Sequence, residues 1–293
     1  MEKNNSPDNF GGLSRRHSNY KNSSIVILPV PFDKTSTWIK GSSKGPQAII
    51  NASKHLELYD IETGSEISIN GIHTAGKVSG LTPEVMVRNV YKKTRKLLAD
   101  NKYTVVVGGE HTVSLGTIKA HVEFFDNVSI LHLDAHSDMR DTYDGIHYSH
   151  ACVMARAKEM TDKIVSVGIR SMDSSELEYI NNKNIFYAAD IRKSKSWINN
   201  ATTKLSDNVY ITIDLDVFDP SIMPSTGTPE PGGLGWYDVI DLLEYVSKKR
   251  NIIGFDVVEL CPSKHVAPDF LAAKLIYKLL SLRFSRFPKN SKA

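Results

Sequence analysis

Short, continuous runs of Val, Ile and Leu alternate along this chain with segments of helical periodicity. Apolar residues at consecutive positions are what a strand buried on both faces requires. Such runs occupy residues 23–31, 103–109, 128–136, 164–170, 184–188, 209–217 and 252–260. Because helical segments separate them, we expect an α/β fold in which a parallel sheet is covered by helices.

The helical segments are expected at residues 45–60, 82–101, 112–125, 174–182, 236–249 and 269–283. The strongest signal is in the second of these. Thr82 suits the N-cap, Pro83 suits the first helical position, and Met86 and Val90 begin an apolar face. This pattern predicts an amphipathic helix that packs on the sheet.

Length and composition limit the organisation of the chain. With 293 residues, of which 41% are hydrophobic, the chain can form one large domain or two small ones. Neither a repeat nor a linker divides it. We therefore expect a single catalytic domain over residues 23–293, preceded by a flexible segment over residues 1–22 that lacks periodicity.

Charge and cysteine content exclude several classes of protein. A net charge of +3 gives no basis for nucleic-acid binding, and the basic C-terminal stretch 281–293 is interpreted as a solvated terminus. The N-terminus lacks the apolar core of a signal peptide, and no apolar run is long enough to span a bilayer. Cys152 and Cys261 are interpreted as small buried residues of a protein in a reducing, cytosolic setting.

Acidic residues and histidines follow three of the predicted strands. Asp134, His136 and Asp138 are spaced two residues apart, Asp214 and Asp216 repeat that spacing, and His111 follows a double glycine. Side chains two apart in an extended segment point the same way. In a parallel sheet, ligands collect beyond the carboxyl ends of the strands. These six side chains are therefore expected to converge there.

Several carboxylates buried side by side need cations near them, because a buried unpaired charge is very costly. Four aspartates and two imidazoles provide enough ligands for two divalent ions, whose charge of about +4 balances the acids. A ligand set rich in oxygen and without thiolate favours Mn²⁺ or Mg²⁺-like ions over structural zinc. Each motif alone has an ordinary alternative, a surface acid pair or a hydrogen-bonded histidine, whereas three strand ends together favour metal.

Four blocks of the sequence, GGEHTVSLG, LHLDAHSDMRD, YITIDLDVFDPSIMPSTGTPEPGGL and GFDVVELCP, resemble the signature blocks of the ureohydrolase family. That family includes arginases, agmatinases and formiminoglutamases. The resemblance extends from about Ile25 to Leu280. It implies a three-layer α/β/α sandwich around a mainly parallel eight-stranded sheet, the arginase/deacetylase-like fold. It also implies two Mn²⁺ ions, with Ni²⁺ or Co²⁺ as alternatives, and a bridging hydroxide that attacks the substrate. The implied ligands are His111, Asp134, His136, Asp138, Asp214 and Asp216.

The resemblance also assigns catalytic roles. Glu259 occupies the position of the carboxylate that binds the guanidinium, and Asp138 is grouped with the catalytic residues as well as with the ligands. His150 is interpreted as the proton shuttle to the leaving amine, with His147 as a loop residue. Ala151 replaces the glycine that is commoner after this histidine.

The loop MRDTYDGIHYS lacks the Ser-Gly-Asn pattern of arginases and is similar to agmatinase loops. Agmatine carries a terminal amine and no carboxylate, so an acidic rim suits it. We therefore predict hydrolysis of agmatine to putrescine and urea, with arginine, guanidinobutyrate and guanidine as alternative substrates. Asp173 is either a partner for the substrate amine or a helix N-cap. His132 is interpreted as a hydrogen-bonded strand histidine.

Two other functions stay open at this point. A catalytically silent metal-binding homologue with a scaffolding role would have this fold, but all the expected ligand positions are filled here. A deacetylase shares the fold and a D-x-H pair but uses one zinc ion, so metal stoichiometry separates the two. By analogy with the family, the protein is expected to be a homo-oligomer, a trimer or a hexamer.

Overall fold

The computed structural model describes residues 7–285. Its centre is an eight-stranded sheet with the order β4-β1-β5-β10-β9-β6-β7-β8, in which all neighbouring strands are parallel. The strands are β1 (Ile25–Val30), β4 (Ile72–Thr74), β5 (Tyr103–Gly108), β6 (Val128–Leu133), β7 (Ile164–Ile169), β8 (Ile185–Tyr187), β9 (Asn208–Asp214) and β10 (Asn251–Val258). A separate hairpin pairs β2 (Tyr59–Asp60) with β3 (Ser65–Glu66).

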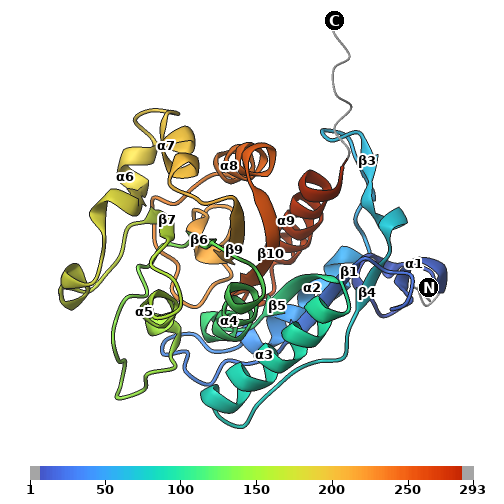
Figure 1. Ribbon diagram of the computed structural model, residues 1–293, viewed down its shortest axis with the longest axis horizontal. Helices are drawn as coiled ribbons and strands as arrows, with labels where there is room; N and C mark the ends of the chain where they lie inside the picture. Colours follow the sequence, from blue (N-terminus) through green and yellow to red (C-terminus); the bar gives the residue numbers. More distant parts are fainter. Residues whose placement is uncertain (1–6, 286–293) are drawn as a thin grey trace, which may run out of the picture.

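Helices cover both faces of the sheet (Figure 1). The helices are α1 (Arg15–Ser18), α2 (Gly45–Ser53), α3 (Pro83–Ala99), α4 (Ser114–Phe124), α5 (Val153–Lys158), α6 (Ala188–Ile191), α7 (Trp197–Thr203), α8 (Trp236–Lys249) and α9 (Ala267–Phe284). One apolar core lies under α2, α6, α7, α8 and α9, and a second lies under α3, α4 and α5. The predicted three-layer α/β/α sandwich with a parallel eight-stranded sheet is therefore confirmed.

Each of the seven predicted strands corresponds to a strand of this sheet, and β4 is the one that was missed. It contains three residues and pairs only with β1 at the sheet edge, so it has no apolar run to reveal it. In α3, Thr82 caps the helix as expected, since its side chain accepts a hydrogen bond from the backbone N–H of Val85 at 3.4 Å.

The helix expected at 174–182 is wrong. Two short 3-10 turns occupy that segment, η6 (Ser174–Glu178) and η7 (Asn182–Asn184). The side chain of Glu176 turns inward and accepts hydrogen bonds from the backbone N–H groups of Met139 and Asp173, both at 2.8 Å. This buried acid pulls the segment against the sheet instead of letting it continue as an exposed helix.

The N-terminal segment packs on the domain from residue 7 onward. Phe10 is fully buried in the first core, and its backbone N–H donates to Thr74 Oγ1 at 2.9 Å. Residues 1–6 of the segment predicted to be flexible, and residues 286–293 of the basic C-terminal stretch, lie outside the described residues. Within residues 7–285, no helix has the length and apolar character needed to cross a membrane.

Candidate functional site

Four neighbouring strands in the middle of the sheet, β5, β10, β9 and β6, end in acids and histidines. His111 begins the 3-10 helix η4 (His111–Val113) after β5, and Glu259 follows β10 directly. Asp214 ends β9, and Asp134 follows β6. Because the strands are parallel, their carboxyl ends lie at one edge of the sheet and bring these side chains together.

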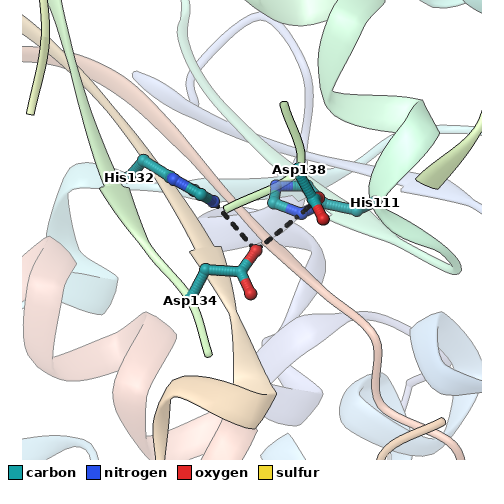
Figure 2. A group of neighbouring side chains, drawn as sticks. All are labelled: His111, His132, Asp134 and Asp138. Carbon is teal, nitrogen blue, oxygen red and sulfur yellow. Dashed lines mark hydrogen bonds and ion pairs between the residues drawn. The ribbon is translucent and has the colours of Figure 1, made fainter. Parts of the chain in front are cut away.

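The first group of side chains surrounds the imidazole of His111. Its Nδ1 atom lies 3.1 Å from Asp134 Oδ2, 3.0 Å from Asp138 Oδ2 and 3.4 Å from Asp214 Oδ2. Figure 2 shows Asp134 and Asp138 directed toward this ring, with His132 on the far side of Asp134. Three carboxylate oxygens, two from the segment after β6 and one from the end of β9, thus meet at one nitrogen.

The tautomer of His111 explains what that nitrogen requires. Thr212 Oγ1 donates to Asp256 Oδ1 at 2.7 Å, so this hydroxyl accepts from His111 Nε2, which lies 2.9 Å away. In the neutral ring, Nδ1 then carries a lone pair, and it is buried without a hydrogen-bond partner among residues 7–285. Although burial alone would lower the pKa of this imidazole, Asp134 and Asp138 raise it well above its usual value, so a proton occupies Nδ1 when no metal is bound. A metal ion bound to the neutral ring would take the place of that proton between the carboxylates.

The second group surrounds His136. Its Nδ1 lies 2.9 Å from Asp216 Oδ2 and 3.6 Å from Asp134 Oδ1, so Asp134 belongs to both groups. Backbone N–H groups hold the acids in place, because Ala135 donates to Asp216 Oδ1 at 3.0 Å and Asp216 donates to Asp214 Oδ1 at 2.9 Å. Two adjacent clusters bridged by one carboxylate form an arrangement that suits two ions.

The described residues fit a pair of hard divalent ions. The two clusters, His111 with His132, Asp134 and Asp138, and Asp134 with His136 and Asp216, each have ligand atoms within 4.8 Å of one another. The donors are carboxylate oxygens and imidazole nitrogens, without a thiolate in either cluster. All six residues predicted as ligands lie here, with Asp214 on the His111 side.

His132 also lies in the first cluster, but both of its nitrogens have protein partners. Nε2 is 2.8 Å from Asp134 Oδ2, and Nδ1 is 3.1 Å from Ser166 Oγ. The ring is fully buried in β6. These contacts agree with its interpretation as a hydrogen-bonded strand histidine that orients Asp134.

The electrostatics of the cluster reflect crowded negative charge. Burial and the neighbouring Asp134 raise the pKa of Asp138 to about 6. Burial, together with Asp216 and Asp134, raises the pKa of Asp214 well above its usual range. Burial would also raise the pKa of Asp134, but His132 and bonds from His111 hold it well below its usual range. Without cations, the acids cannot all remain ionised together.

Two acids at the floor of the site, one in a cluster and one beside it, have left-handed backbone conformations. The φ angles are +53° at Asp138 and +66° at Glu259, where a non-glycine residue is strained. Hydrogen bonds from α5 hold the first, since the carbonyl of Asp138 accepts from the N–H of Met154 at 2.9 Å. The N–H of Glu259 donates to the carbonyl of Gly109 at 2.7 Å. The backbone turns sharply at these points, and each acid is held at the floor of the pocket.

A pocket of about 220 Å³ opens above the clusters. At its floor, Glu259 Oε1 accepts a hydrogen bond from the N–H of His111 at 2.7 Å. The other oxygen, Oε2, lies 3.8 Å from the point where a Cβ at Gly227 would stand. One oxygen is therefore anchored, and the second lies beside an open space that only a glycine leaves. The wall residues include Ser36, Thr37, Trp38, Ile39, Arg140, Tyr143, His150, Met172, Asp173 and Thr228.

His150 lines this pocket from the start of the 3-10 helix η5 (His150–Cys152). Burial, with added repulsion from His136 and His111, lowers the pKa of its imidazole to about 4. The ring packs edge-on against Tyr143, with the centroids 5.7 Å apart. The other candidate, His147, is exposed and lies 3.0 Å from Arg156 Nη1 through its Nδ1. The structure thus places His150, and not His147, on the pocket wall.

Asp173 is an N-cap, one of its two predicted roles, and its role as a partner for the substrate amine stays a prediction. Its carboxylate caps η6 by accepting from the N–H of Ser175 at 3.0 Å, and the residue also lines the pocket. Arg140 Nη2 lies 3.4 Å from Asp173 Oδ2, and Arg140 stacks over the ring of Tyr143 at 5.0 Å. Asp173 therefore both caps η6 and lines the rim of the pocket.

Sequence reasoning missed three supporting side chains. Glu110 is fully buried and binds residues 35 and 36, while Glu176 binds the backbone near Asp138. Arg170 Nη2 donates to the carbonyls of Asp216 and Glu230, at 2.5 and 2.8 Å. Glu110 is adjacent to a predicted ligand, which is the only signal in the sequence that could have found it.

Comparisons with known proteins identify the family of this chain. The family model described as "Arginase family" matches residues 23–281. The chain is 36% identical over 275 residues to the N(1)-aminopropylagmatine ureohydrolase of Synechocystis sp., covering 90% of each chain. It is 31% identical to the agmatinase of Pyrococcus horikoshii, covering 89% of this chain and 93% of that one.

Solved structures give the same result. The agmatine ureohydrolase of Thermoplasma volcanium superimposes with a TM-score of 0.86 at 32% sequence identity, covering 95% of this chain and 94% of that chain. Most of this chain therefore has the same fold as that ureohydrolase.

Proposed function

The chain belongs to the arginase family of ureohydrolases, and from that premise we propose that it hydrolyses agmatine to putrescine and urea. Enzymes of this family are hydrolases of linear carbon–nitrogen bonds that depend on a binuclear metal centre. The observation that carries the proposal is the position of Glu259, a carboxylate at the floor of a pocket directly beside the two ligand clusters.

The proposed ligands of the two ions are His111, Asp134, His136, Asp138, Asp214 and Asp216, and Mn²⁺ is the proposed metal. A pair of bound dications lowers the pKa of water and so supplies a nucleophile near neutral pH. The oxygen-rich donor set and the position of His111 Nδ1 within 3.0 to 3.4 Å of three carboxylate oxygens support this assignment.

Glu259 is proposed to bind the guanidinium of the substrate. A carboxylate and a guanidinium pair through two parallel hydrogen bonds, which determine both the position and the plane of the group. Burial and repulsion from Glu110 raise the pKa of Glu259 well above its usual range. A cationic substrate compensates this unpaired charge, so binding and alignment come from the same contact. The missing side chain at Gly227 leaves room for the flat group beside Glu259 Oε2.

His150 is proposed to deliver the proton that the departing amine needs. A low pKa makes the protonated ring a strong acid, so a proton that reaches it from solvent is readily given up to the amine. Its position on the pocket wall supports that role. Tyr143, packed against the ring, limits its movement.

The tail of the substrate is proposed to be a carboxylate-free, cationic chain. Asp173 at the rim offers a carboxylate to an ammonium group, and Trp38 offers an exposed aromatic face. The relatives named N(1)-aminopropylagmatine ureohydrolase support a second candidate, the N-aminopropyl derivative of agmatine, whose longer tail would extend past this open rim.

The proposal is tested by urea release from purified protein loaded with Mn²⁺, Ni²⁺ or Co²⁺. Agmatine, N(1)-aminopropylagmatine, arginine, guanidinobutyrate and guanidine are compared at equal concentration. We expect the highest kcat/KM with agmatine or its aminopropyl derivative and with Mn²⁺. If arginine or guanidinobutyrate were preferred, the proposed substrate would be wrong, although the reaction class would stand. The trimer or hexamer expected from family resemblance stays a prediction that sedimentation can check.

A further inference from the structure

The segment 33–41 passes over the pocket and is held at both ends by carboxylates. Asp33 Oδ2 accepts from the N–H of Gly41 at 3.1 Å and from Ser43 Oγ at 2.8 Å. Glu110 Oε2 accepts from the N–H of Thr35 at 2.8 Å and from that of Ser36 at 2.7 Å. Between these anchors, residues 36–39 form part of the pocket wall.

Glu110 has no role in the chemistry described so far, although it precedes a proposed ligand and is fully buried. Its hydrogen bonds go to Thr35 and Ser36, including one from Thr35 Oγ1 to Oε1 at 2.7 Å. An acid buried beside other acids is costly. The hydrogen bonds from Thr35 and Ser36 offset part of this cost, and they hold the segment 33–41 in place.

The hydroxyl of Thr35 connects these hydrogen bonds to His150. Its one proton goes to Glu110 Oε1, so its oxygen is left to accept hydrogen bonds. The backbone N–H of His150 donates to it at 3.1 Å, and the imidazole Nδ1 lies 3.4 Å away. Two other hydroxyls are near, since Thr112 Oγ1 lies 3.3 Å from Thr35 Oγ1 and Ser149 Oγ lies 3.4 Å from Nδ1.

We propose that Glu110 and Thr35 are positioning residues that hold His150 in place for proton transfer. The inference rests on the proposed role of His150. Thr35 binds both the backbone and the Nδ1 side of this residue, so the Nε2 side of the ring is the one left to face the substrate. The Thr35 hydroxyl also connects the wall segment 33–41 to His150, because Thr35 belongs to that segment and contacts the histidine. A misplaced catalytic group costs about 100-fold in rate for a displacement of about 1 Å.

The test removes the hydroxyl without changing the shape of the side chain. Thr35→Val is expected to lower kcat by about 10- to 100-fold, with KM and bound metal unchanged. Thr35→Ser keeps the hydroxyl and is expected to restore kcat to within about threefold of wild type. The matched control is Thr112→Val, which removes a buried hydroxyl from the other side of Thr35 without touching His150, and its kcat should stay close to wild type. If Thr35→Val does not fold, Thr35→Ala provides the same comparison.

A double-mutant cycle separates positioning from a general effect on the fold. In the His150→Asn background, Thr35→Val should cause little further loss, because the group that it positions is already absent. Equal losses in both backgrounds would overturn the inference, as would a Thr35→Val variant with normal kcat. The cycle uses the compound that the wild type hydrolyses fastest. If the wild type releases urea from none of the guanidino compounds tested, the proposed function and this inference are overturned together. If the wild type is active and the Thr35→Val variant is unaffected, the inference alone is overturned.

Discussion

Replacement of Glu259 by Gln tests the proposed binding of the guanidinium directly. Gln has the same shape, and its side-chain oxygen can still accept from the N–H of His111, as Oε1 does at 2.7 Å. Its amide N–H group would stand where Oε2 lies, beside Gly227, and would face the N–H groups of the substrate. The change therefore removes the charge and reverses one hydrogen bond but leaves the anchor intact.

The size of the effect follows from the burial of the pair. Glu259 is 9% exposed, so little water screens its charge. Removing one partner of a buried ion pair costs about 3 to 5 kcal/mol. At about 1.36 kcal/mol per factor of ten, Glu259→Gln should lower kcat/KM by roughly 10²- to 10⁴-fold.

The assay is steady-state urea release, with bound metal measured on the same samples. Metal content should be unchanged, because Glu259 lies outside the two ligand clusters. The substrate-free variant should also be no less stable than the wild type, since the substitution removes repulsion between Glu259 and Glu110. A variant with normal metal content and kcat/KM within about tenfold of wild type would refute the assigned role.

Three further outcomes are expected. Gly227→Ala would place a Cβ 3.8 Å from Glu259 Oε2 and 3.4 Å from the carbonyl of Ile39, so KM should rise about tenfold, and an unchanged KM would show that the guanidinium lies elsewhere. Trp38→Ala removes a side chain that is 80% exposed at the rim, so KM for a cationic substrate should rise about two- to fivefold at constant kcat, as measured by steady-state kinetics. Burial lowers the pKa of His121 to about 4, so the neutral ring stabilises the native state above pH 6.5, and up to about 3 kcal/mol is lost as the pH falls toward 4. Urea denaturation across this range should show that the difference in the free energy of unfolding between wild type and His121→Gln shrinks as the pH falls. A constant difference would contradict the lowered pKa of His121.

The parts of the fold that could be predicted most directly from sequence are those with a long local signal, either a helical period or a continuous apolar run. β1, β5, β6, β9 and β10 are six or more residues long and nearly fully buried, so each gives a continuous apolar run. β4, α5, α6 and α7 contain three to seven residues, too few for a period to appear. Their structure depends on tertiary contacts, which a local pattern does not contain.

The same distinction applies to the site. Alternating acids at strand ends indicate convergence because a parallel sheet brings its carboxyl ends together, so the clusters could be expected from spacing alone. Glu110 and Glu176 carry no such signal. Each is a single acid whose partners, residues 35 and 36 for one and Met139 for the other, are distant in sequence. Only the folded chain shows which segment each acid holds.

Strain and charge repulsion coincide at the centre of the site. Asp138 and Glu259 combine a left-handed backbone with a pKa that burial raises, so each is costly in two independent ways. A glycine would relieve the backbone strain, of order 1 kcal/mol, but would remove the carboxylate. The surrounding sheet, with α5 against Asp138 and the carbonyl of Gly109 against Glu259, is rigid enough to hold both conformations. The free energy of unfolding is therefore lowered by the residues proposed to bind metal and guanidinium. Binding of the metal ions and of the cationic substrate would raise it again in part.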